Sequence, residues 1–148
     1  WKEDPPDPQD EATFLQAKLN QALCRQGHHR VLSGYYRELI RLRKSNPCLA
    51  HLSKKRQEIS DDTRKKLLLV RRWNESAEVR IIFHFGDDHA SVPLSISEGR
   101  WLKLMDSAEK QWQGPGSPQA AEIESTGELT LDRPPHSVLV LAGERSEI

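Results

Sequence analysis

The stretch from Lys65 to Phe85 constrains the fold most strongly, because it contains two apolar runs of strand length. The first reads KKLLLVRRW and the second EVRIIFHF, and the short polar segment 74–77 separates them. Two such runs joined by a few polar residues predict neighbouring antiparallel strands. The first run is continuously apolar from Leu67 to Val70, which predicts a central strand that is covered on both faces.

The second run alternates with a period of two residues, as a half-buried strand does. The expected inward face is apolar and holds Val79, Ile81, Phe83 and Phe85. The opposite face holds Arg80, Ile82 and His84. We therefore expect Phe83 to be a buried residue of the core.

Further short apolar runs follow, and polar turn segments separate them. The expected strands are residues 90–96, 100–106, 121–125, 128–132 and 137–142, with one more short strand at 57–60. In the strand 100–106, alternation places Trp101, Lys103 and Met105 on one face. Short strands with regularly spaced turns predict a mainly β fold, an antiparallel β-sandwich of about 90 to 100 residues.

The first 50 residues have a different pattern. Residues 1–10 form a proline-rich, acidic connector, which cannot be the interior of a helix. Asp10 can cap a helix that we expect through residues 11–26 and that Gly27 ends. A second helix is expected from about His29 to Ser45, with Pro47 after it. The chain therefore divides into a helical segment, 1–50, and a β-sandwich domain, 51–148.

Charge and hydropathy limit the classes of partner that we expect for this chain. The 22 basic and 22 acidic residues give a formal net charge of zero, so nothing steers the whole chain toward nucleic acid. The basic groups at 54–56 and 64–66 have acidic neighbours and no interleaved aromatic residues, which indicates a solvated surface. No apolar stretch approaches the ~20 residues of a membrane span, and nothing at the amino end resembles a signal peptide. We expect no nucleic-acid or membrane partner.

Cysteine usage favours a cytoplasmic protein. The chain has two cysteines, Cys24 and Cys48, which fit reduced thiols better than a disulfide framework, although one bridge between them is allowed. A zinc site needs three or four convergent ligands. Cys24 and His28 have helical spacing, but no CxxC or HxxxH pair supplies the other ligands. We therefore expect no metal and no cofactor, and we expect His84 and His136 to be hydrogen-bonded structural residues.

Trp112 is the tryptophan that we expect to be most exposed, because it lies in the Gly- and Pro-containing loop 107–118. Its ring could stack on the apolar face of a pyranose, or it could plug the loop against the rest of the domain. Catalytic carboxylates are harder to find. The pairs 61–62 and 87–88 lie in turn segments, where Asp is common for local reasons.

Four segments, taken in order, point to a family. These are PDPQDEATFLQAKLNQAL, GYYRELIRLRKSNP, GRWLKLMDSAEKQWQGPGS and PPHSVLVL. They closely resemble the carboxyl-terminal end of malto-oligosyltrehalose trehalohydrolases, which are family 13 glycoside hydrolases of the alpha-amylase group. The resemblance runs from about Pro6 to Leu141. His84 departs from it, because an asparagine is expected in an FNFG-type motif, and residues 144–148 extend past the usual end.

The resemblance implies an upstream (β/α)8 barrel with an aspartate nucleophile and a glutamate acid/base. Such enzymes hydrolyse the α-1,4 bond next to the terminal trehalose unit of malto-oligosyltrehalose. This chain would hold the last barrel helix, at about His29 to Ser45, the β domain and no catalytic residue. Loops after barrel strands face the active site, so Asp7, Gln9 and Asp10 become candidates for proximity to the substrate, with Trp112 as a fourth.

Two functions of different class stay open. In the first, the chain is the structural end of a trehalose-releasing hydrolase and is inactive alone. In the second, the β domain is a non-catalytic carbohydrate-binding or interaction module. The expected partners are malto-oligosyltrehalose or maltodextrin in the intact enzyme. We also expect self-association through residues 10–45, because two amphipathic helices without a partner expose apolar surface.

Overall fold

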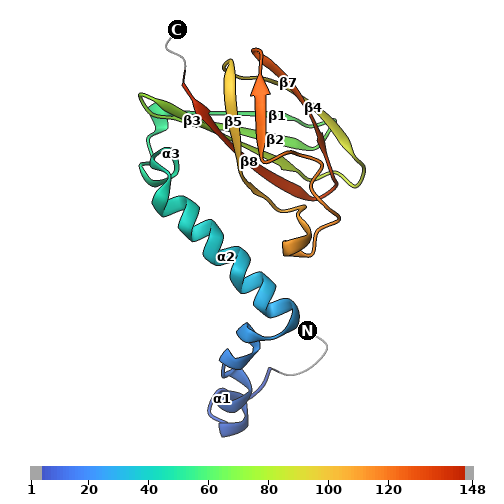
Figure 1. Ribbon diagram of the computed structural model, residues 1–148. Coiled ribbons are helices and arrows are strands. Elements are labelled where there is room, and N and C mark those ends of the chain that lie inside the picture. The colour runs from blue at the N-terminus through green and yellow to red at the C-terminus, as the bar shows by residue number, and fades with distance from the viewer. Residues whose placement is uncertain (1–4, 146–148) are drawn as a thin grey trace.

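The computed structural model describes residues 5–145 (Figure 1). The first four residues of the connector and the last three of the carboxyl-terminal extension lie outside the described residues. The helical elements are α1 (Glu11–Ala17), η1 (Gln21–Arg25), α2 (Gly27–Ser45), α3 (Pro47–Ala50), η2 (Lys54–Arg56) and η3 (Lys110–Trp112). The strands are β1 (Gln57–Asp62), β2 (Leu67–Trp73), β3 (Ala77–His84), β4 (Ala90–Ser95), β5 (Gly99–Asp106), β6 (Glu122–Ser125), β7 (Glu128–Arg133) and β8 (Ser137–Glu144).

The strands form two antiparallel sheets. The larger has six strands in the order β1-β2-β3-β8-β5-β6, and the smaller pairs β4 with β7. The expected pair at 65–85 is β2 and β3, in which Leu67 lies opposite His84 and Trp73 lies opposite Glu78. Both strands are central in the large sheet, because β1 and β8 flank them. The mainly β, antiparallel fold is therefore as the sequence predicts.

The small sheet covers one face of the large sheet, and a hydrophobic core fills the space between them. Trp101, Leu139 and Leu141 from the large sheet are fully buried there, and Val92 and Leu131 come from the small sheet. These positions alternate with outward-facing residues along β4 and β7, as the inner faces of a sandwich require.

Helices cover part of the opposite face of the large sheet. A second core joins Leu42 of α2 and Cys48 of α3 to Val79, Met105 and Val140 of the sheet. The carboxyl-terminal end of α2 lies on the sandwich, and the helix runs away from it toward α1 (Figure 1). The large sheet is thus a middle layer, with strands on one side and helices on the other.

The prediction for the faces of β3 was wrong. Ile82 and His84, expected to face outward, belong to the inner face and are only 1% and 3% exposed. Val79 and Ile81 pack against the helices instead. Phe83 is half-buried and Phe85 is 57% exposed, and their rings stack on each other 6.1 Å apart. Both faces of this strand are apolar because both are covered, so alternation alone could not select the inner one.

The alternation predicted for β5 also fails. A β-bulge between Lys103 and Met105 shifts the register with β8. Trp101 therefore points into the inter-sheet core while Met105 points to the helices, although the two residues are an even number apart. A bulge adds one residue to a strand, so side chains beyond it change face.

The first predicted helix is broken. Asp10 caps α1 as expected, but α1 ends at Ala17, and Asn20 caps the separate short helix η1. None of the residues in α1 is buried, and a helix of one or two turns is not stable without tertiary packing. Gly27 has a φ of 44° and begins α2 two residues earlier than predicted. Asn46 follows α2, and Pro47 starts α3.

Candidate functional site

The three connector residues predicted to lie near substrate make local contacts. Asp7 Oδ1 accepts from the Gln9 amide at 2.9 Å, and Asp10 Oδ1 accepts from the Ala12 amide at 2.9 Å. All three side chains are exposed. These contacts give Asp7 the role of a turn residue and Asp10 that of a helix cap. Their proximity to a substrate stays a prediction.

Trp112 lies at the end of η3 and packs against helix α2. Its ring meets the Tyr35 ring edge-on, with centroids 5.4 Å apart, and it also lies beside Gly34. The indole Nε1 is buried and has no hydrogen-bond partner within residues 5–145. This geometry is that of a plug between the loop and the helix, the second of the two roles considered for Trp112. A contact with substrate stays a prediction.

The loop that carries Trp112 is tied to the start of α2 as well. His28 Nδ1 lies 2.6 Å from the side-chain oxygen of Gln113, and an amide oxygen can only accept, so the imidazole donates. Gln113 adopts a φ of 64°, which turns the chain at the end of η3. Burial, followed by the nearby Asp106 charge, raises the pKa of Tyr35. The loop therefore holds α2 at two places along its length.

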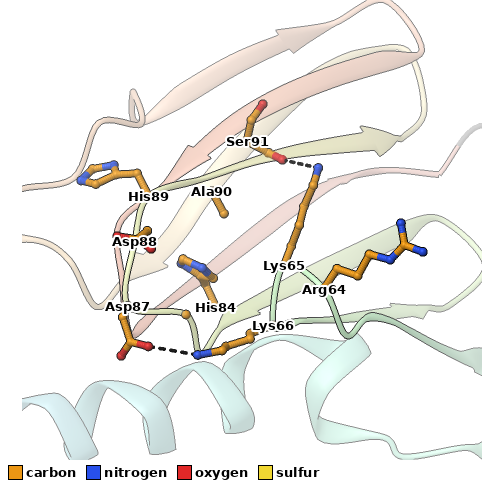
Figure 2. A pocket seen from close by; sticks show the side chains of 10 residues that line it. Arg64, Lys65, Lys66, His84, Asp87, Asp88, His89, Ala90 and Ser91 are labelled. Carbon is orange, nitrogen blue, oxygen red and sulfur yellow. Dashed lines mark hydrogen bonds and ion pairs between the residues drawn. The ribbon is translucent and has the colours of Figure 1, made fainter.

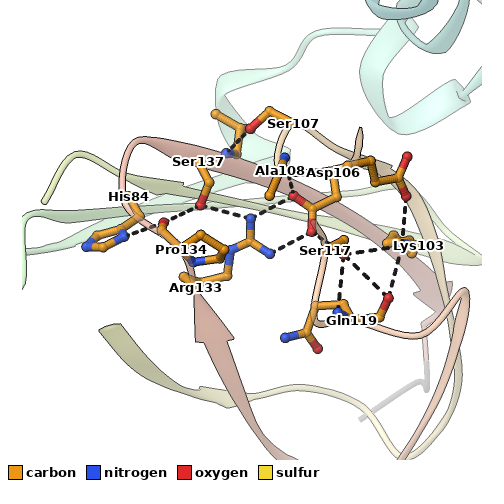
Figure 3. A network of polar contacts seen from close by, with 12 residues as sticks. His84, Lys103, Asp106, Ser107, Ala108, Ser117, Gln119, Arg133, Pro134 and Ser137 are labelled. Carbon is orange, nitrogen blue, oxygen red and sulfur yellow. Dashed lines mark hydrogen bonds and ion pairs between the residues drawn. The ribbon is translucent and has the colours of Figure 1, made fainter. Parts of the chain in front are cut away.

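A buried ion pair anchors the other end of this loop (Figure 3). Arg133 Nη1 and Nη2 each donate to one carboxylate oxygen of Asp106 at 2.8 Å, and both side chains are fully buried. Asp106 also accepts from Ser117 Oγ at 2.7 Å and from the Ala108 amide at 2.9 Å. The carboxylate thus has four donors, which join the strand end to both ends of the loop.

The network continues toward β3. Arg133 Nη2 donates to Ser137 Oγ at 3.0 Å, and Ser137 donates to the Pro134 carbonyl at 2.6 Å. The same carbonyl accepts from His84 Nδ1 at 2.8 Å, which agrees with the structural role expected for this histidine. Burial raises the pKa of Asp106, but the hydrogen bonds from Arg133, Ser117 and Ala108 outweigh it, and the pKa lies below its usual value.

Helix α2 carries an apolar stripe that the β domain does not cover. Leu32, Tyr36 and Ile40 are 43%, 58% and 52% exposed, whereas Leu42 on the opposite side is 5% exposed. Large exposed apolar residues continue in α1 and η1 and in the link between them, at Phe14, Leu15, Leu19 and Leu23. Exposed large apolar residues gathered on these helical elements indicate a contact with another protein segment.

The side chains that could bind a metal ion lie scattered over the described part of the chain. Among residues 5–145 there is no group of three or more His, Cys, Asp or Glu side chains arranged to hold a metal ion. Cys24 is exposed and Cys48 is buried, and neither is in a disulfide. Burial raises the pKa of the Cys48 thiol, which donates to the Ala77 carbonyl. No helix in this part of the chain is long and apolar enough to cross a membrane.

Sequence comparison identifies the relatives. A malto-oligosyltrehalose trehalohydrolase of Deinococcus radiodurans is 36% identical over 105 residues, which are 69% of this chain and 17% of the relative. The enzyme of the same name from Rhizobium sp. strain M-11 is 39% identical over 89 residues, or 59% and 14% of the two chains. This chain matches the carboxyl-terminal region of malto-oligosyltrehalose trehalohydrolases. No protein-family model matches it.

Structural comparison agrees on the fold. The alpha-amylase of H. orenii is 18% identical with a TM-score of 0.59, and the match covers 94% of this chain and 25% of the amylase. The trehalulose synthase MutB of Pseudomonas mesoacidophila MX-45 is 16% identical with a TM-score of 0.53, over 84% of this chain and 21% of the synthase. The chain spans about a quarter or less of each of these proteins, trehalohydrolases included.

Proposed function

We propose that this chain is the structural, non-catalytic end of a glycoside hydrolase of the trehalohydrolase type. The complete enzyme hydrolyses the α-1,4-glucosidic bond next to the trehalose end of malto-oligosyltrehalose and releases trehalose. Its substrate and maltodextrins are partners of the intact enzyme, not of this segment. The enzyme works in the cytoplasm, which is consistent with the free thiols of Cys24 and Cys48.

The exposed stripe of α2 is the observation that carries this proposal. The helix packs on the β domain through one side and leaves Leu32, Tyr36 and Ile40 uncovered on another. The last helix of a (β/α)8 barrel has to pack against the barrel strands and the neighbouring helices. The stripe supplies an apolar surface for that contact, and the sequence similarity to trehalohydrolases supports the same arrangement.

A chimaera tests the proposal. The matching carboxyl-terminal region of the Deinococcus radiodurans enzyme is replaced by this chain, and trehalose release from malto-oligosyltrehalose is measured. We expect activity within about 10-fold of the parent, since the replaced region holds no catalytic group. A second chimaera with Tyr36→Glu and Ile40→Glu should unfold at a lower temperature, because it places charges in the barrel contact.

The control chimaera carries Arg37→Glu, a change of an exposed residue outside the stripe. It should keep the melting temperature and activity of the first chimaera. A folded first chimaera without activity would contradict the proposal. The proposal would also fail if the stripe variant were as stable and active as the control.

The alternative function is a carbohydrate-binding or interaction module. In that case the isolated chain would bind maltodextrin saturably, with no help from a barrel. Calorimetric titration of the chain with maltodextrin separates the two functions. The chimaera experiment does not depend on its outcome.

We also propose that the chain, when it is separated from a barrel, self-associates through residues 10–45. The apolar side chains exposed along α1, η1 and α2 are the reason, and two copies could cover them together. Light scattering should give a mass above that of a monomer for the whole chain. A version with Leu32→Ser, Tyr36→Ser and Ile40→Ser should be monomeric. Monomers in both cases, at high concentration, would refute self-association.

A further inference from the structure

Strand β4 forms an edge of the small sheet, which pairs it with β7 alone in the described part of the chain. Just beyond the two strands, the Ile96 amide donates to the Gly127 carbonyl at 3.1 Å, in the register that β4 and β7 share. Backbone groups alternate in direction along an antiparallel strand, so those of Ser91, Pro93 and Ser95 point away from β7. An outward row of this kind is a template on which another strand can pair.

The residues of β4 protect this edge only in part. Its sequence, ASVPLS, contains no charged side chain, although charged residues commonly protect an exposed edge. Pro93 is in the middle of the outward row and has no amide hydrogen, so a strand that paired here would lose one hydrogen bond. The carbonyl groups of Ser91 and Ser95, on either side of it, require another cover.

Two cationic side chains from outside the small sheet cover those carbonyls. Lys65, in the turn between β1 and β2, donates from Nζ to the Ser91 carbonyl at 3.0 Å (Figure 2). Arg80 of β3 donates from Nη2 to the Ser95 carbonyl at 3.2 Å. Hollows of about 330 and 410 Å³ open at these two places, and the same residues line them. The two side chains therefore occupy the acceptors where there is space beside β4.

A buried carboxylate directs Arg80 toward β4. Glu78 is 1% exposed, and its Oε1 accepts from Arg80 Nε at 3.2 Å. Its other oxygen accepts from Arg71 Nε at 2.8 Å, so both carboxylate oxygens have a guanidinium partner. A guanidinium is planar and its donors have fixed directions, so the contact at Nε restricts where Nη2 can point. Glu78 is thus a positioning residue for the contact between Arg80 and Ser95.

We propose that Lys65, Pro93 and Arg80 close the outer edge of β4 against the same strand of a second copy of this chain. Two copies of this edge are self-complementary, because antiparallel pairing about a twofold axis places the donors of one copy opposite the acceptors of the other. The outward side chains of Ser91 and Ser95 are small and uncharged, so they offer no repulsion. The closure belongs to the β domain, and it depends neither on the trehalohydrolase function nor on association through residues 10–45.

Removal of the closure tests the proposal. The changes Lys65→Met, Arg80→Met and Pro93→Thr are made in the whole chain that already carries the three serine substitutions in the α2 stripe. They remove both donors and restore an amide hydrogen in the middle of the strand. Light scattering should show a mass that rises with concentration above that of the parent. The amide hydrogens of Ser91 and Ser95 should then exchange at least about 10-fold more slowly, because they enter a new strand pair.

Slower exchange is the specific readout, because a loss of stability alone makes amide hydrogens exchange faster. The matched control is Lys55→Met, which makes the same change of a lysine in η2 and should leave the mass and the exchange unchanged. If the triple variant does not fold, the variant with Lys65→Met and Pro93→Thr decides, since it keeps the contact between Glu78 and Arg80.

Both readouts are needed to support the closure of β4. A folded variant that keeps the mass of its parent would overturn the proposal. A higher mass without slower exchange at Ser91 and Ser95 would overturn it too, since the copies would then meet elsewhere. The same response in the Lys55→Met control would have the same consequence. None of these outcomes alters the result expected for the chimaera, which tests a different surface.

Discussion

Asp106→Asn should destabilise the β domain by about 3 to 5 kcal/mol, the usual effect of removing one partner of a buried ion pair. The carboxylate oxygen Oδ2 accepts from Arg133 and from Ser117, at 2.8 and 2.7 Å. An amide nitrogen in its place would face the Arg133 guanidinium as a second donor, and the flipped amide would face Arg133 Nη2 and the Ala108 amide in the same way. A lost hydrogen bond to a charged group is worth about 1.5 to 3 kcal/mol, and the lost counter-charge of the buried Arg133 adds to it. The Arg133 guanidinium would stay buried without its counter-charge.

Urea unfolding measures this effect, with Ser117→Ala as the milder variant if the first does not fold. Ser117→Ala removes the hydrogen bond to the Asp106 carboxylate, together with longer contacts to Lys103 and Gln119, and should lower stability by about 1.5 to 3 kcal/mol. The pH dependence gives a second readout. The folded pKa of Asp106 is depressed, so its contribution is complete above its unfolded pKa of about 3.9 and is lost as pH falls through the folded pKa. Asp106→Asn should remove that part of the acid slope. An unchanged urea midpoint and an unchanged slope would refute the reasoning.

Three further predictions concern the core and the activity. Ile82→Ala should cost about 2 to 5 kcal/mol in urea unfolding and Phe83→Ala clearly less, because only Ile82 is fully buried; the reverse order would contradict the face assignment of β3. Gly143→Ala should cost about 1 to 3 kcal/mol, because its Cβ would lie 2.6 Å from the buried Trp101 ring, and a neutral effect would show that the ring can move. The chain alone should release no trehalose from malto-oligosyltrehalose, since glycoside hydrolysis needs two placed carboxyl groups, and turnover by protein free of contaminating hydrolases would contradict this.

The strands could be predicted because the residues at their ends determine where each strand begins and stops. The apolar runs end at glycine, proline, aspartate or asparagine residues, whose preferred backbone geometry favours turns. The expected strand at 128–132 is β7 at Glu128–Arg133, and the one at 137–142 is β8 at Ser137–Glu144. The same holds for α2, which has its own apolar face and a proline near its end.

The inner face of β3 and the bulge in β5 could not be predicted, because both depend on partners distant in sequence. Ile82 is buried by the small sheet, and Met105 is buried by the helices. The burial of each side chain therefore depends on the layer that packs against it and not on the local sequence pattern. The bulge also turns Asp106 inward to meet Arg133, which is 27 residues away in the sequence. Neither charged residue stands out from its neighbours in the sequence, and the pair was missed.

The pairing of Lys66 with Asp87 was missed for a related reason. The basic run at 64–66 was interpreted as solvated surface, and its side chains are indeed exposed. Its second role comes from the β3–β4 connection, which brings Asp87 against Lys66 across 21 residues. His84 gave a partial signal, since it occupies the place where an asparagine was expected. Only the fold shows that one ring nitrogen is tied to the Pro134 carbonyl and that the other faces Gly86.

The contacts of α2 suggest what the β domain contributes to a larger enzyme. The helix is fixed near its start by His28 on Gln113, in its middle by Tyr35 on Trp112, and beyond its end by Cys48 in the second core. The first two anchors lie on the loop that the Asp106–Arg133 pair holds to the sheet. A helix held at three points keeps its orientation, so the exposed stripe is presented in one direction. The sandwich therefore fixes the orientation of α2. Weakening the buried ion pair between Asp106 and Arg133 should make α2 less rigidly held, although neither residue contacts the exposed stripe.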